Sequence, residues 1–244
     1  DITRVELSNG IVVLVRSNFN SPSIVLNGYL EVGSLFDPPD KLGLASFTAS
    51  SLLLGSKKFD YNTIYDLLES AAASLSFEGG THITSFGGRS LVEDFNMLCE
   101  IFAAAIKEPT FPPEHVERKR AQLLTGLILR SQDTAEMASL TFDEIVYAHH
   151  PYRFPEEGTL ETVQQITLED LVNFHHRHYG PRGMVIVVVG AIEPSTAISI
   201  LSEHLADWQN DEQPLPPELP PLQPLTETVQ KKVFIPGKSQ VDLL

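Results

Sequence analysis

The chain has 244 residues, 42% hydrophobic and 20% charged, a composition that excludes a disordered chain and allows a sizeable buried core. Seventeen basic and 32 acidic residues leave a net charge of −15 at pH 7, which opposes binding to nucleic-acid phosphates. No apolar run approaches the ~18–20 residues of a membrane-spanning helix, so we expect no membrane insertion. The single cysteine, Cys99, allows no internal disulfide and no cysteine-rich metal site.

The first part of the chain alternates between strand and helix patterns. Asn9-Gly10 in front of a β-branched run predicts a tight hairpin, and residues 23–32 form a second extended run. Helical patterns follow over Gly43–Leu54, which Gly55 closes, and over Tyr61–Ala72. A second hairpin is predicted from Ser74–Phe77 and Thr81–Phe86, with Gly79-Gly80 between them.

Longer helical patterns dominate the second part. They cover Leu91–Lys107, Pro113–Arg130, Ala135–Ala148 and Leu168–His178. Thr167 with Asp170 is typical of a helix cap. A buried strand, Met184–Val189, precedes a last helix, Ser195–Trp208. Paired strands with runs of helices between them predict an α+β fold, in which helices pack on a mostly antiparallel sheet.

The composition changes after Trp208. Six of the eleven residues from Pro214 to Pro224 are proline, which favours a semi-rigid extended spacer. We therefore expect one α+β domain over 1–209 and a proline-rich linker over 210–231. Residues 232–244 are expected to form the first strand of a further, truncated domain, so we interpret the chain as a fragment of something longer.

The order of these elements and several short motifs resemble the pitrilysin/insulinase/mitochondrial-processing-peptidase family of zinc metallopeptidases, M16. The motifs are Leu7-Ser8-Asn9-Gly10, Val32-Gly33-Ser34, Gly43-Leu44-Ala45, Leu53-Leu54-Gly55-Ser56, Pro109-Thr110-Phe111 before Val116-Glu117-Arg118, Ile186-Val187-Val188-Val189-Gly190 and Val233-Phe234-Ile235-Pro236-Gly237-Lys238-Ser239-Gln240. The resemblance covers essentially the whole chain. It implies the LuxS/mitochondrial-processing-peptidase-like metallohydrolase fold, and its last motif looks like the entry to a second domain of the same type.

The catalytic motif of the family is missing. Active members carry H-x-x-E-H on their first long helix, where two histidines bind zinc and the glutamate is the general base; a later glutamate completes the ligands. The resemblance places Ser46, Ala49 and Ser50 at the motif positions and Gly126 at the distal glutamate position. None of these side chains can bind zinc or take a proton from water in the way that the family requires. We therefore expect no catalytic residue and no metal ligand at these four degenerate positions.

One other histidine cluster could hold a metal ion. His175 and His178 are three residues apart on a predicted helix, with His176 between them and Asp170 more than one turn away. The alternative is a polar helix end, where histidine suits the C-terminal dipole. The chain contains no G-x-S-x-G nucleophile motif and no phosphate-binding glycine loop.

The resemblance implies a non-catalytic lobe of a zinc-dependent M16-type endopeptidase, which completes a peptide-binding chamber. The catalytic lobe is then fused in cis or is a separate subunit in trans, zinc is expected in that partner lobe, and this chain needs no cofactor. Residues Ser74, Leu75, Ser76 and Phe77 match the family's substrate-side strand, so we expect peptide to bind there. Two alternatives are a purely structural subunit, like the core subunits of a respiratory complex, and an enzyme of unrelated chemistry on the same scaffold.

Overall fold

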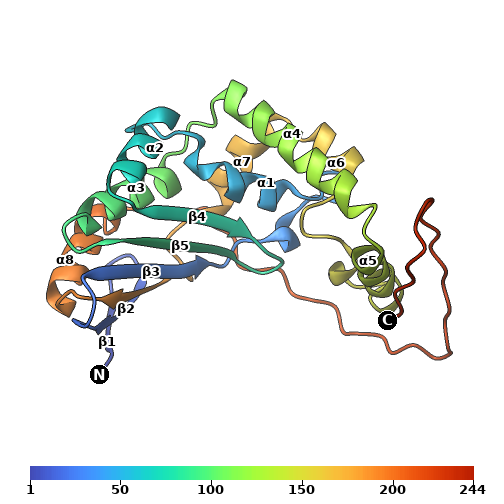
Figure 1. Ribbon diagram of the computed structural model, residues 1–244. Helices are drawn as coiled ribbons and strands as arrows, with labels where there is room; N and C mark the ends of the chain where they lie inside the picture. The colour runs from blue at the N-terminus through green and yellow to red at the C-terminus, as the bar shows by residue number, and fades with distance from the viewer.

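The computed structural model describes residues 1–244 and shows a six-stranded sheet with helices on one face (Figure 1). The strands are β1 (Thr3–Glu6), β2 (Val12–Ser17), β3 (Ser23–Leu30), β4 (Ser74–Gly79), β5 (Thr84–Leu91) and β6 (Val185–Gly190). The helices are α1 (Leu44–Ser51), α2 (Tyr61–Ser70), α3 (Phe95–Lys107), α4 (Pro113–Arg130), α5 (Thr134–Val146), α6 (Leu160–Gln165), α7 (Leu168–His178) and α8 (Pro194–Leu205). Three short 3-10 helices are η1 (Ser34–Phe36), η2 (Leu52–Leu54) and η3 (Pro151–Arg153).

The strand order across the sheet is β1-β2-β6-β3-β5-β4. Only β2 and β6 pair in parallel, and every other neighbouring pair is antiparallel. The expected α+β fold with a mostly antiparallel sheet is therefore confirmed. β1 and β4 form the two edges of the sheet, and β6 fills its centre although it comes last in the chain.

The core lies between the sheet and its helices. Side chains of the strands alternate between the two faces, and those on the helix side, such as Ile24 and Leu26 of β3, are fully buried. The helices contribute large aromatic rings to the same cluster, among them Phe47, Phe95 and Phe102. No helix covers the opposite face of the sheet (Figure 1), and its side chains are partly or fully exposed.

Several expected boundaries were wrong for local reasons. The helix expected from Leu91 begins at Phe95, because Leu91 pairs with Ser23 and ends β5. The helix expected to run to Leu54 ends at Ser51 and tightens into η2. Gly55, with a φ of 150°, then turns the chain as expected. The sequence did not predict the short helix α6.

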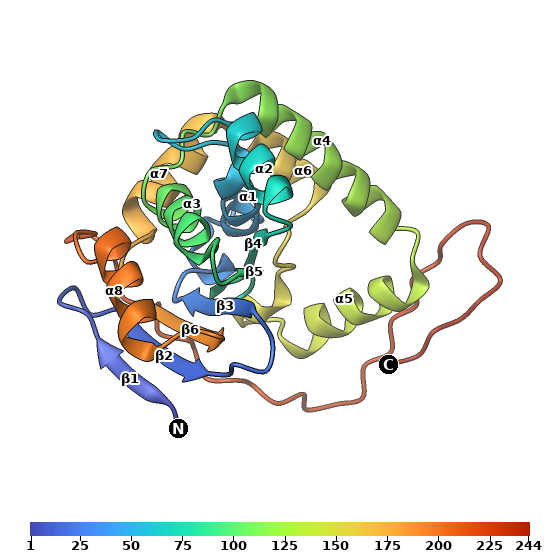
Figure 2. The same ribbon diagram turned by 60° about the vertical axis from the view of Figure 1, so that its left-hand side comes forward.

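The folded body continues past the expected boundary at residue 209. Gln213 is buried, and its side chain bonds both backbone groups of Arg182. From residue 214 the chain has no helix or strand and passes outside α5 before it returns to that helix (Figure 2). Residues 232–244, where a strand was expected, form no strand in this structure. None of the helices is both long and apolar enough to span a membrane.

Candidate functional site

β4 is an edge strand that pairs only with β5, so its outer side has no strand partner. Ser74, Leu75, Ser76 and Phe77, the predicted substrate strand, all lie in β4. Leu75 and Phe77 are buried on the helix side, whereas Ser74, Ser76 and Glu78 are exposed on the helix-free face. An exposed edge of this kind offers unpaired backbone groups to an extended peptide.

Aromatic packing holds β4 against the core. The ring of Phe77 stacks on Phe102 of α3, with 5.8 Å between the ring centres and 7° between the planes. Phe102 also contacts Phe86 of β5, at 4.6 Å between ring centres. Because aromatic pairs add to the energy of simple burial, the inner side of β4 is fixed, and only its outer edge and its helix-free face remain available.

The first turn of α1 lies directly against the end of β4. A Cβ atom on Gly79 would lie 2.8 Å from the Cα of Ser46 and 3.1 Å from the carbonyl oxygen of Ala45. Only glycine allows this approach, because real Cβ contacts are longer. The edge strand is therefore next to the helix on which the family resemblance places the catalytic motif.

The side chains at the four motif positions offer no ligands for a zinc ion. Ser46 is partly exposed, Ala49 is 1% exposed, and the hydroxyl of Ser50 donates to the carbonyl oxygen of Phe47 at 3.1 Å. Gly126 is exposed, and a Cβ there would meet nothing within 4 Å; the next residue, Leu127, is the buried one on this turn of α4. No nitrogen, thiolate or carboxylate is present, so these residues do not fit a zinc ion.

The half-buried carboxylate of Asp37 fixes the start of α1. The two oxygens of Asp37 accept hydrogen bonds from the backbone N–H groups of Gly43 and Ala45, both at 2.8 Å. Asp37 therefore caps the helix from outside its first turn. Burial raises the pKa of the Asp37 carboxyl to about 7, and the backbone donors oppose this shift.

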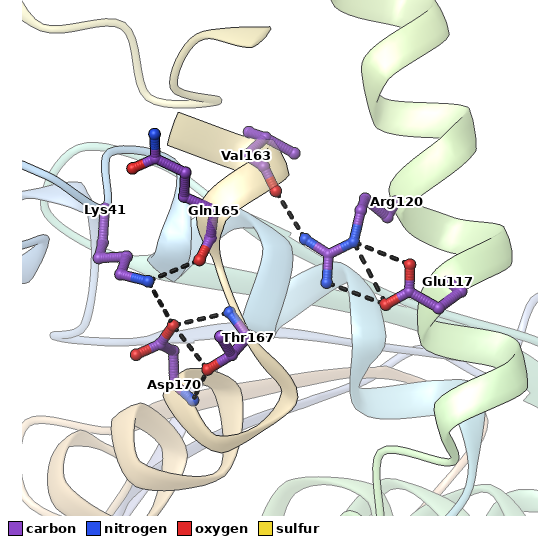
Figure 3. A network of polar contacts seen from close by, with 7 residues as sticks. All are labelled: Lys41, Glu117, Arg120, Val163, Gln165, Thr167 and Asp170. Atoms are coloured by element: carbon purple, nitrogen blue, oxygen red, sulfur yellow. Dashed lines mark hydrogen bonds and ion pairs between the residues drawn. The ribbon is translucent and has the colours of Figure 1, made fainter. Parts of the chain in front are cut away.

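A second set of polar contacts joins the segment before α1 to α6 and α7 (Figure 3). The Nζ of Lys41 donates to the carbonyl oxygen of Gln165 at 2.6 Å and to Oδ2 of Asp170 at 2.8 Å. Asp170 also accepts from the N–H and the hydroxyl of Thr167, at 2.7 and 2.8 Å. Thr167 and Asp170 form a capping box, which confirms the predicted cap and shows that Asp170 serves α7.

Arg120 connects α4 to α1 and α6. Its guanidinium carbon lies 5.1 Å from the ring centre of Phe47 in α1, and one nitrogen donates to the carbonyl oxygen of Val163 at 2.6 Å (Figure 3). Glu117 pairs with the same guanidinium through both of its oxygens. Arg120 and Lys41 thus place two cations at the C-terminus of α6, where helix carbonyls lack partners.

Two other segments of the chain form hydrogen bonds with the turn between β4 and β5. One oxygen of Glu156 accepts from the N–H of Thr81 at 2.9 Å and from its hydroxyl. The carbonyl oxygens of Gly80 and Thr81 accept from the N–H groups of Ser34 and Leu35, at 2.9 and 3.1 Å. The end of the edge strand nearest to α1 is therefore tied to two separate segments.

Sequence reasoning missed the residues that position this site. Lys41, Arg120 and Glu156 act on segments more than 40 residues away, and a single sequence shows no sign of such pairs. Asp37 offered a weak local signal, because it is an acidic residue shortly before a helix. Its distance from Gly43, however, is too long for an ordinary cap, which bonds two or three residues ahead.

The structure does not bring the histidine cluster together. The Nε2 of His175 donates to the carbonyl oxygen of Ile106 at 2.8 Å. His178 is buried between the rings of Phe36 and Phe174, with ring centres 4.7 and 4.5 Å away. Burial lowers the pKa of both His175 and His178 to about 4. No group of three or more histidine, cysteine or acidic side chains in residues 1–244 could hold a metal ion.

Comparison with known protein families identifies the family of this chain. Residues 12–149 match the family described as Insulinase (Peptidase family M16), which is more than half of the chain. The chain belongs to peptidase family M16. Residues 165–244 match a second profile, described as Peptidase M16 inactive domain. The resemblance noted from the sequence motifs is thereby confirmed.

Individual relatives agree with this assignment. The chain is 23% identical over 210 residues to the probable mitochondrial-processing peptidase subunit beta of Arabidopsis thaliana, covering 86% of this chain and 40% of that protein. It is 22% identical over 203 residues to cytochrome b-c1 complex subunit 1 of Rattus norvegicus, covering 82% of this chain and 42% of that protein. A crystal structure of a peptidase M16 inactive domain from Pseudomonas fluorescens superposes with a TM-score of 0.82 and 26% identity, covering 92% of this chain and 54% of that one. The chain thus spans less than half the length of these two curated relatives.

Proposed function

We propose that this chain is a non-catalytic lobe of an M16-type zinc-dependent endopeptidase and completes a peptide-binding chamber with a catalytic lobe. The observation that carries the proposal is that a strand with a free edge lies next to the helix whose motif positions lack zinc-binding side chains. β4 keeps a free edge beside α1, while Ser46, Ala49, Ser50 and Gly126 supply no metal donor. The match of residues 165–244 to an inactive domain supports the same assignment.

In this proposal, an extended peptide binds along β4. Its main chain pairs with the backbone of Ser74, Leu75, Ser76 and Phe77 and extends the sheet by one strand. Main-chain hydrogen bonds do not depend on the side chains of the peptide, so the edge accepts varied sequences. Buried Leu75 and Phe77 keep the edge rigid, which lowers the entropic cost of binding.

Zinc and the catalytic residues are assigned to the partner lobe, either fused in cis or separate in trans. In this proposal the proline-rich segment from residue 214 to 231 acts as a linker, and residues 232–244 belong to the next domain. Elemental analysis of the dialysed chain tests the metal assignment. We expect far less than one zinc per chain, and a full equivalent that His175→Ala removes would contradict it.

A second candidate is a purely structural role with no peptide binding. The similarity to cytochrome b-c1 complex subunit 1 favours this candidate, because that name describes a component of a larger complex. It predicts large permanent interfaces and no affinity for extended peptides, so peptide binding separates the two proposals.

The test uses fluorescent eight-residue peptides and their backbone N-methylated forms. In a paired strand, alternate N–H groups point toward the partner. Methylating one alternate set should therefore weaken binding at least tenfold, whereas methylating the other set should have little effect. Equal loss from both sets, or no binding at all by fluorescence anisotropy, contradicts pairing along β4.

A protein variant provides the matching evidence. Backbone groups alternate in direction along an antiparallel pair, and Gly80 donates to Ile83 at the end of β4, so the N–H of Leu75 points to the outer edge. Leu75→Pro removes that N–H, whereas Leu75→Ala keeps it and shortens the same side chain. We expect only Leu75→Pro to abolish peptide binding. Circular dichroism and thermal melting check that both variants keep the fold.

A further inference from the structure

The helix-free face of the sheet contains a polar hollow beside the proposed peptide edge. The hollow has a volume of about 380 Å³. Its lining consists of Asn27, Gly28, Ser76, Glu78, Ser85, Phe86 and Gly87. Five of these residues point to the helix-free face by strand alternation, and they come from β3, β5 and β4.

The hollow exists because a glycine occupies the middle of a row of paired residues. Gly87 of β5 pairs with Asn27 of β3 on one side and with Ser76 of β4 on the other. With no side chain at Gly87, the floor of the hollow is backbone. A Cβ at Gly87 would lie 3.1 Å from Oδ1 of Asn27, so even alanine would crowd the space.

The lining presents hydrogen-bond acceptors and one negative charge. Glu78 is exposed and takes part in none of the salt bridges of the chain. The hydroxyls of Ser76 and Ser85 make only long bonds, 3.4 Å, to the carbonyl oxygens of Gly87 and Glu78. Hydroxyl oxygens keep two lone pairs while they donate, so these groups can accept from a cation.

The position of the hollow relates it to a peptide on β4. A strand added outside β4 directs every second side chain to the face that carries Ser74, Ser76 and Glu78. Neighbouring strands lie about 4.8 Å apart, so a long side chain crosses β4 and reaches the space over Gly87. Arg89 lies on the same face but pairs with Ser74, at the far end of β4 from Glu78.

We propose that this hollow is a specificity subsite for a lysine or arginine side chain of a peptide bound along β4. The cation pairs with Glu78, and the oxygens of Asn27, Ser76 and Ser85 accept its remaining hydrogens. The net charge of −15 attracts basic peptides to the chain as a whole, and the hollow fixes which residue of the peptide is basic. This subsite rests on the proposed function, because the peptide must first bind to β4.

The test compares eight-residue peptides that differ at one position, lysine against norleucine, which has a similar length and no charge. The lysine is moved along the peptide one residue at a time, and binding to the full chain is measured by fluorescence anisotropy. We expect one position at which lysine binds about tenfold more tightly than norleucine. Equal affinities at every position overturn the subsite.

Three variants identify the residues responsible. Glu78→Gln and Gly87→Ala should each remove the preference for lysine, the first by removing the charge and the second by filling the hollow. Glu69→Gln removes the same charge from an exposed position on α2 and should leave the preference unchanged. An equal effect of Glu69→Gln and Glu78→Gln would show general charge attraction and overturn the subsite.

The outcomes also separate this inference from the proposed function. Peptides that bind in an N-methylation-dependent manner, but without a preference for lysine, contradict only the subsite. If no peptide binds to the chain, both proposals fail together.

Discussion

Gly79 and Ser46 approach each other so closely that a Cβ on Gly79 would lie 2.8 Å from the Cα of Ser46. This contact joins the end of the free edge strand to the first turn of α1, where the catalytic motif of active relatives is placed by resemblance. The distance between strand and helix is therefore set by backbone atoms. Small side chains at the motif positions therefore leave the spacing between β4 and α1 unchanged.

A Gly79→Ala substitution should destabilise the protein by about 1–3 kcal/mol, because α1 must move to admit the new methyl group. Gly126→Ala is the matched control, since nothing lies within 4 Å of a Cβ there and the residue is in an exposed part of α4. It should stabilise the chain by roughly 0.5–1 kcal/mol. Urea unfolding of both variants measures the two effects; the same sign for both would contradict the close packing.

The cap that Asp37 provides for α1 should make the stability depend on pH. The pKa of Asp37 is about 7 in the folded chain and about 3.8 when unfolded, so between these values the folded chain binds the extra proton. The contribution of Asp37 to the free energy of unfolding is thus fully present below pH 4 and is lost as the pH rises through 7. In Asp37→Asn this component should disappear from unfolding curves recorded between pH 4 and 8. An unchanged profile would mean that Asp37 does not titrate in this range.

Two histidines should change stability with pH in the direction opposite to that of Asp37. Burial lowers the pKa of His175 and His178 from 6.5 to about 4, so between these values the unfolded chain binds more protons. Stability should therefore fall as the pH decreases from 6.5 to 4, by roughly 2 kcal/mol per histidine at pH 5. The stability lost through the two histidines exceeds the stability gained through Asp37, so these three groups together lower the free energy of unfolding in acid.

His178→Leu isolates one of these contributions. Leucine keeps an apolar group between Phe36 and Phe174, and it cannot be protonated. The difference in unfolding free energy between pH 7.5 and pH 5 should shrink in this variant. His176→Leu is a control, because His176 is exposed on the same helix; an equal change in both variants would contradict the role of burial.

The true end of the folded body can be tested by truncation. Asn210 donates to the carbonyl oxygens of His176 and Tyr179, at 3.0 and 2.9 Å, and Gln213 bonds both backbone groups of Arg182. A chain that ends after Gln213 should match the stability of the full chain within about 0.5 kcal/mol, because the later segment makes only surface contacts. Ending the chain after Trp208 should cost about 2–4 kcal/mol. Equal stability of the two truncated chains would contradict this boundary.

Local patterns were enough to predict most elements. Pro113 and Arg130 were predicted as the ends of α4, and Thr167 with Asp170 was predicted as a cap, because caps and helix periodicity depend on neighbours in the chain. The start of α3 was wrong because Leu91 belongs to β5, and only pairing with β3 decides that. The short α6 has too few residues to show a period.

The candidate site was predictable only in part. β4 was placed correctly, since alternation marks Ser74–Phe77 as a half-buried strand. The position of β4 at the edge of the sheet depends on the order of all six strands, and residues 74–77 alone do not reveal that order. The hollow over Gly87 was not predicted, because it depends on Asn27 and Ser76 being placed on either side of one glycine by two separate strand pairings.

The central place of β6 has a consequence for how the molecule forms. β6 lies between β2 and β3 and pairs with both, although about 170 residues separate it from β2 along the chain. Until Val185–Gly190 leaves the ribosome, β1–β2 and β3–β5–β4 are two unconnected pieces with exposed inner edges. Such distant pairing slows folding and prolongs the exposure of these edges. Assembly of the sheet therefore waits for the last strand, and a chain that stops before residue 185 cannot join its two parts into one sheet.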